Sequence, residues 1–297
     1  MTYLMVSTIG MAVYSLDPPH IIMKRNFPGY SKLGRSMRID VNAFLGRYPF
    51  RHAPGGSPQA LLAAMDRIGV EQAWLSNLSA VFWRDPTEGN PLLYSAVEHH
   101  QRLRPVPAVH PGLTNWKDVL TEARERGAPA VRSDPTFYGV DPACGAMLEL
   151  AAGCAESELP LMLAVRFEDG RQRHPNDRAE ELPPHAVRAL VRAHPRVRLL
   201  ITHADRDFIE QVHFGSTPAE ASRILWDICW IWGPPEDHLA LLIETMGAER
   251  FTFGTGMPLR IPETSVAKLD LLDLAEEERG RIESGNLLAF VKVRGET

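Results

Sequence analysis

Residues 38–50 read RIDVNAFLGRYPF, a short run of apolar and β-branched residues that ends in a Gly-Arg-Tyr-Pro turn. A run of this kind, bounded by turn residues, predicts a strand at residues 38–44. The following segment, SPQALLAAMDRIG (57–69), predicts a helix, because Ser57 suits the N-cap, Pro58 the first helical position and Gly69 the stop. The two segments together predict a strand followed by a helix, and this unit decides the fold because it recurs.

The same alternation continues to the end of the chain. Further strands are expected at residues 72–77, 105–110, 129–134, 161–167, 198–205, 224–231 and 250–255. Further helices are expected at residues 115–127, 142–158, 183–194 and 234–247. Eight strands alternating with helices predict an α/β fold, the (β/α)8 or TIM barrel, which takes roughly 250 residues. A doubly wound open sheet is the alternative, and the lack of a glycine-rich phosphate loop after the first strand counts against it.

The chain of 297 residues divides unevenly. Residues 1–36 contain several prolines and show no hydrophobic periodicity, so we expect a loosely structured N-terminal extension. Residues 37–297 are expected to form the barrel domain.

Composition excludes several classes of protein. Hydrophobic residues make up 44% and charged residues 23% of the chain, and the net charge is −5, so no nucleic-acid or membrane partner is expected. The three cysteines form no CxxC pair, which favours a reducing, cytoplasmic location. A homodimer is the expected oligomer, if any.

The chemistry of such a barrel lies at the C-terminal ends of its strands. The side chains selected there are Asn42, Arg47, Arg132, Asp134, Arg166, Glu168, His203 and Asp205. We call the C-terminal end of the barrel its mouth. Several guanidinium groups at this mouth favour a carboxylate-binding pocket, because a guanidinium binds a carboxylate through two parallel hydrogen bonds. The alternative is a closed salt-bridge network, in which Asp134 and Glu168 pair with these arginines.

Five segments resemble one known family, and they occur in that family's order. They are IDVNAFLGRYPF (39–50), LRPVPAVHP (103–111), RLLITHAD (198–205), GAERFTFGTGMP (247–258) and AEEERGRIESGNLLAF (275–290). The last two are the most specific. The chain resembles the amidohydrolase-related family, in the branch that includes aminocarboxymuconate-semialdehyde decarboxylase. The resemblance implies a TIM barrel of the metal-dependent-hydrolase type.

The family's metal site is altered in this sequence. Its ligand positions fall on Asn42, Phe44, Val165 or Arg166, His203 and Gly256. Only His203 keeps the family's residue, and no close ligand spacing such as HxH or HExxH replaces the others. We therefore expect no cofactor, with a divalent metal such as zinc as the alternative.

Two functions follow from the resemblance and the strand-end residues. The first is a hydrolase or decarboxylase that acts on a small carboxylate-bearing molecule, with His203 as general acid or base. In that role Asp205 would orient His203, the arginines would hold the substrate carboxylate, and Asn42 would add one hydrogen bond. The second is a catalytically silent barrel that binds an anionic ligand or a partner protein.

Overall fold

The computed structural model describes residues 37–291 and has eight parallel strands. The expected N-terminal extension, residues 1–36, lies outside the described residues. The strands are β1 (Ile39–Leu45), β2 (Gln72–Asn77), β3 (Leu103–Pro105), β4 (Val131–Arg132), β5 (Leu161–Ala164), β6 (Leu199–Thr202), β7 (Ile224–Asp227) and β8 (Phe251–Thr252). Each expected strand is present, and most are shorter than the sequence pattern predicts. The strand expected at 105–110 lies earlier, because Pro105 and Pro107 have no N–H to donate to a ladder.

The strands close into a barrel. Continuous ladders join β1 to β3 and β4 to β8 in sequence order. Parallel bridges between Ala108 and Arg132 and between Ala43 and Met257 connect the two groups of strands. The prediction of a (β/α)8 barrel is confirmed.

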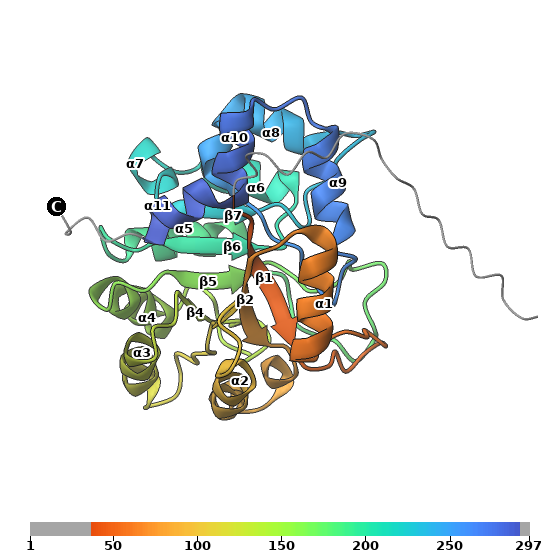
Figure 1. The fold of residues 1–297 in the computed structure, drawn as a ribbon. Coiled ribbons are helices and arrows are strands. Elements are labelled where there is room, and N and C mark those ends of the chain that lie inside the picture. Colours follow the sequence, from red (N-terminus) through yellow and green to blue (C-terminus); the bar gives the residue numbers. More distant parts are fainter. Residues whose placement is uncertain (1–36, 292–297) are drawn as a thin grey trace, which may run out of the picture. The chain divides into compact units, whose positions relative to one another are not determined.

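Helices surround the strands (Figure 1). They are α1 (Pro58–Ile68), α2 (Asn90–Val97), α3 (Trp116–Glu125), α4 (Gly145–Glu156), α5 (Pro184–Arg192), α6 (Arg206–His213), α7 (Pro218–Ala221), α8 (His238–Met246), α9 (Glu263–Leu271), α10 (Glu276–Gly280) and α11 (Asn286–Val291). The limits predicted for α1 agree with its structure: the Ser57 side chain accepts a hydrogen bond from the Ala60 N–H, and Gly69 ends the helix at φ +70°. Within residues 37–291 no helix is long and apolar enough to cross a membrane.

The barrel interior is filled by one or two apolar side chains from most strands. This layer contains Ile39, Val41, Trp74, Val106, Ala130, Met162, Leu200 and Leu225. Leu287 of α11 packs on the same layer, so the last helix covers one end of the barrel. The functional groups therefore lie at the other end, where the strands finish.

Strand β1 has an irregular register between Asp40 and Ala43. Ile39 and Val41 pack in the interior layer, whereas Ala43 packs in the cluster between strands and helices. The irregularity turns Asn42 toward the mouth, directly after the inward-facing Val41. Asp40 and Asn42 therefore do not share one face, as plain two-residue alternation would have them.

Asp40 instead links β1 to the segment after β8. Its Oδ1 accepts hydrogen bonds from the backbone N–H groups of Asn42 (2.9 Å) and Thr255 (3.0 Å), and its Oδ2 accepts from the Thr255 hydroxyl (2.5 Å). Burial outweighs these hydrogen bonds and raises the pKa of Asp40 from 3.8 to about 6.

Replacing Asp40 by asparagine is expected to change how stability depends on pH. The folded state binds this proton more tightly than the unfolded state, so the stabilisation is present below pH 4 and is lost as pH rises through about 6. The stability of Asp40→Asn relative to wild type should therefore improve by roughly 3 kcal/mol between pH 4 and pH 8. Urea unfolding at the two pH values measures this, with the exposed Asp273→Asn as control. A difference between Asp40→Asn and wild type that stays constant with pH would contradict the assignment.

Candidate active site

His203 lies at the end of β6, fully buried and in an unusual backbone conformation, with φ +59°. A non-glycine residue in this region costs about 1–2 kcal/mol, and such strain concentrates at functional sites. The backbone N–H of His203 donates to Asp227 Oδ1 at 3.1 Å. Its Nδ1 lies 3.3 Å from Thr202 Oγ1 and 3.4 Å from Asn42 Nδ2. Its Nε2 is buried and has no hydrogen-bond partner among residues 37–291.

Asn42 connects β1 to β7 across the mouth. Its Nδ2 donates to Asp227 Oδ2 at 2.7 Å and approaches Cys229 Sγ at 3.6 Å. Burial raises the pKa of both Asp227 and Cys229, and hydrogen bonds to Cys229, Asn42 and His203 oppose the rise at Asp227. Asp227 was recognised as a strand-end residue but not selected for the site, and Cys229 was missed, although two-residue alternation along 224–231 places them on one face.

Asp205 does not orient His203, in contrast to the expected arrangement. Its Oδ1 caps helix α6 by accepting a hydrogen bond from the Phe208 N–H at 3.0 Å. Its Oδ2 pairs with Arg166, whose other terminal nitrogen lies 2.8 Å from Glu181. Asp227 is the acid that contacts His203, through the backbone of that residue.

Arg132 and Asp134 form a buried ion pair. Arg132 Nε lies 3.2 Å from Asp134 Oδ2, and neither side chain is more than 2% exposed. Arg132 Nη1 also donates to Asn42 Oδ1 at 3.4 Å. The guanidinium carbon lies 4.7 Å from the centre of the Phe44 ring and 5.4 Å from that of Phe167. Arg132 is therefore part of a closed salt-bridge network and not of an open carboxylate-binding pocket.

The other expected binding residues have partners away from His203. Glu168 Oε1 accepts a hydrogen bond from Arg51 Nε at 2.7 Å. Arg47 is exposed, and its backbone N–H donates to Ser79 Oγ at 2.9 Å. Arg47 and Glu168 thus lie outside the network of hydrogen bonds that contains Asn42 and His203.

The charges around His203 keep its imidazole neutral. Burial lowers the pKa of His203 well below 6.5, and the fields of Arg132, Arg260 and Arg166 lower it further. A neutral imidazole has one nitrogen that donates and one that accepts. Nε2 is thus either a hydrogen-bond donor or an acceptor, depending on which ring nitrogen carries the proton.

Comparison with known protein families places the whole barrel domain. The family model described as amidohydrolase matches residues 36–291. The chain belongs to the amidohydrolase family. No significant match occurs among curated protein sequences.

Several solved structures share the fold. The 2,6-dihydroxybenzoate decarboxylase from Rhizobium has a TM-score of 0.64 at 14% identity, over 86% of this chain and 99% of that chain. The 5-carboxyvanillate decarboxylase from Novosphingobium aromaticivorans, crystallised with manganese, has a TM-score of 0.64 at 14% identity, over 87% and 96%. A probable 2-pyrone-4,6-dicarboxylic acid hydrolase from Acinetobacter baumannii, with citric acid bound, has a TM-score of 0.60 at 13% identity, over 86% and 98%. At these identities the structures establish the fold of this amidohydrolase.

The residues at the mouth do not fit a divalent metal. Phe44 and Gly256 have no donor atom, and the guanidinium of Arg132 lies against the rings of Phe44 and Phe167. Residues 37–291 contain no group of three His, Cys, Asp or Glu side chains that could hold a metal ion. A guanidinium next to the retained histidine repels a second cation, so we assign no step of chemistry to a metal here.

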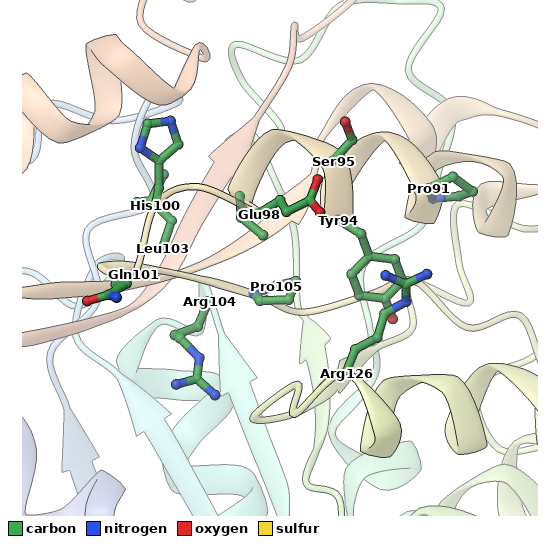
Figure 2. Close-up of a pocket in the computed structure, with 11 residues that line it drawn as sticks. Pro91, Tyr94, Ser95, Glu98, His100, Gln101, Leu103, Arg104, Pro105 and Arg126 are labelled. Atoms are coloured by element: carbon green, nitrogen blue, oxygen red, sulfur yellow. The ribbon is translucent and has the colours of Figure 1, made fainter.

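One large cavity of this amidohydrolase lies away from the mouth (Figure 2). It has a volume of about 780 Å³ and lies between α2 and the start of β3. Figure 2 shows the Arg126 guanidinium against the ring of Tyr94, at 4.4 Å from its centre. Since β3 enters the barrel here, the cavity is at the end opposite His203 and is not the candidate active site.

Proposed function

We propose that the protein is an amidohydrolase-family enzyme that binds a small carboxylate-bearing molecule at the barrel mouth and hydrolyses or decarboxylates it without a tightly bound metal. The observation that carries this proposal is His203. It is a strained, buried residue, and its Nε2 is left without a partner by the described chain. A purely structural histidine would have both ring nitrogens satisfied, because buried polar atoms are almost always hydrogen-bonded.

Decarboxylation suits these residues better than hydrolysis does. Hydrolysis at neutral pH needs a strong nucleophile, which family enzymes obtain from metal-bound water. Decarboxylation breaks a C–C bond, leaves the electron pair on carbon and needs one proton to be delivered there as CO2 departs. In this proposal the imidazole of His203 takes up one proton from water and Nε2 delivers one to that carbon, so the ring is neutral again after each turnover and the hydroxide combines with CO2 as bicarbonate. Asn42 holds the imidazole, and Asp227 holds Asn42 and the backbone of His203.

The second candidate function, a catalytically silent barrel that binds an anion or a partner protein, is favoured by the buried Arg132–Asp134 pair. That pair occupies part of the mouth without leaving either group open to a substrate. The unpartnered Nε2 of His203 favours the enzyme over this alternative.

The proposal includes the remaining expectations from the sequence. The working unit is residues 37–297, as a monomer or homodimer, with residues 1–36 as an extension. Its location is the cytoplasm, where the free thiols of Cys144, Cys154 and Cys229 stay reduced. We propose no nucleic-acid or membrane partner.

Metal removal is expected to leave activity unchanged. The full-length protein, purified without added metal, is assayed for CO2 release from 2,6-dihydroxybenzoate and 5-carboxyvanillate, before and after dialysis against EDTA. We expect substoichiometric zinc and manganese by elemental analysis and equal turnover in both samples, because the mouth lacks a ligand set. One metal ion per chain, with activity lost on dialysis and restored by that ion, would contradict the metal-free mechanism.

A further inference from the structure

Three buried nitrogen atoms without partners surround one tryptophan. The centre of the Trp230 ring lies 5.9 Å from that of His203, 5.7 Å from Arg166 Cζ and 3.5 Å from Arg260 Cζ. His203 Nε2, Arg166 Nε and Arg260 Nε are all buried and have no hydrogen-bond partner in residues 37–291. Buried donors are rarely left unpaired, so three around one ring indicate an acceptor that the described chain does not supply.

Arg260 differs from the other arginines at the mouth in its charge compensation. Arg132 and Arg166 each pair with carboxylates. The guanidinium of Arg260 forms no hydrogen bond or ion pair with any residue of 37–291. Glu168, an acid whose field acts on Arg260, is bonded to Arg51. Of Arg132, Arg166 and Arg260, only Arg260 thus has no carboxylate paired with it in residues 37–291, which suits an anionic ligand.

Gly256 lies close against these groups. Its φ of +69° is one that glycine adopts without strain. A Cβ there would lie 3.2 Å from His203 Nε2 and 3.6 Å from Arg260 Cδ, so a side chain at this position would crowd both groups. Arg260 also lines a cavity of about 570 Å³ between α1 and the segment after β8.

We propose that Arg260, with Nε2 of His203 beside it, binds the carboxylate of the ligand and so determines which molecules this mouth accepts. The edge of a guanidinium fits a carboxylate through two hydrogen bonds, and the stacked Trp230 holds that edge in place. When Nδ1 of His203 accepts from Asn42, Nε2 carries the ring proton and donates to the carboxylate. The inference rests on the proposed function only in that the ligand carries a carboxylate.

The binding test uses the full-length protein with three probes, which are benzoate, its neutral isostere benzamide, and inorganic phosphate. Benzoate is expected to raise the melting temperature with a saturable dependence on concentration, because a ligand of the native state stabilises it. Benzamide should give no shift, and phosphate a clearly smaller one. Equal shifts with benzoate and benzamide, or with benzoate and phosphate, would overturn the carboxylate assignment. So would the absence of any shift with benzoate.

Substitutions of Arg260 test whether benzoate binds at this residue. Arg260→Gln is expected to raise the Kd of benzoate by about 10- to 100-fold, the effect of losing a hydrogen bond to a charged group. It should leave the melting temperature of the unliganded protein at or above that of wild type, because it removes an uncompensated, half-buried cation. Arg260→Lys should bind benzoate with intermediate affinity. The control is Arg196→Gln, an exposed arginine that precedes β6 at the opposite end of the barrel. Unchanged benzoate affinity in Arg260→Gln would overturn the proposal.

Steady-state kinetics of Arg260→Gln distinguish a failure of this inference from a failure of the proposed function. A guanidinium stabilises the charged carboxylate in the ground state, and that charge moves to carbon as CO2 forms, so Arg260→Gln should raise KM without a comparable loss of kcat. Benzoate binding that depends on Arg260, in a wild-type protein without turnover, would support the inference while the proposed enzyme fails. Turnover by the wild type with an unchanged KM in Arg260→Gln would support the proposed enzyme and overturn the role of Arg260.

Discussion

The free energy of unfolding is expected to fall by about 3–5 kcal/mol when Arg132 is replaced by methionine, because this removes one partner of a buried ion pair. Asp134 would then be a carboxylate with about 1% of its side chain exposed and no counter-charge beside it. Burial already raises the pKa of Asp134, and Arg132 opposes that rise. Urea unfolding followed by far-ultraviolet circular dichroism measures the loss.

The pH dependence and a double variant identify the cause. Without Arg132 the folded-state pKa of Asp134 rises further, so the defect should be larger at pH 8 than at pH 5, where the carboxyl binds a proton. Arg132→Met combined with Asp134→Asn should recover at least half of the loss, since both charges are then absent. Arg196→Gln is the surface control. A loss below about 1 kcal/mol, or a double variant no more stable than the single one, would show that the pair does not stabilise the fold.

Most of the fold was predictable because hydrophobic periodicity and turn residues are local signals. Segment 57–69 shows this, since its cap, its proline and its terminal glycine each occupy the expected place. Strand lengths were less predictable. The first two strands have nearly the expected bounds, whereas β4 and β8 have only two ladder residues each, because ladder pairing depends on neighbours far away in sequence.

The location of the site was predictable from the sequence, but the contacts between its residues were less so. His203 and Asn42 were placed at the mouth from the order of the strands. The partner of each arginine was not, since Arg132 and Arg166 each had acids within a few residues and the choice depends on three-dimensional geometry. Trp230 and Arg260 were not among the predicted site residues, because a buried donor without a partner has no sequence signature.

Replacing His203 by glutamine is expected to lower kcat/KM for the carboxylate substrate by about 10²- to 10⁴-fold, the usual contribution of a general acid or base. Glutamine keeps a polar side chain at the position but cannot transfer a proton at neutral pH. The loss corresponds to about 3–5 kcal/mol of transition-state stabilisation. Initial rates of CO2 release over a range of substrate concentrations measure it, with the exposed His99→Gln as control.

The pH profile of the wild-type enzyme gives an independent check on the same residue. Because burial and three arginines hold the pKa of His203 well below 6.5, the imidazole stays neutral throughout the range above that value. If the neutral imidazole is the active form, kcat/KM should be constant from pH 7 to pH 9 and should fall only on the acid side of pH 6.5, where the ring begins to bind a second proton. A profile that falls as pH rises through 6.5–7.5 would mean that an ordinary, solvated histidine controls the rate. Retention of more than about a tenth of wild-type kcat/KM in His203→Gln would remove His203 from the chemistry, since a positioned proton donor contributes at least about 10²-fold. The buried Nε2 would then act only in binding, beside Arg260.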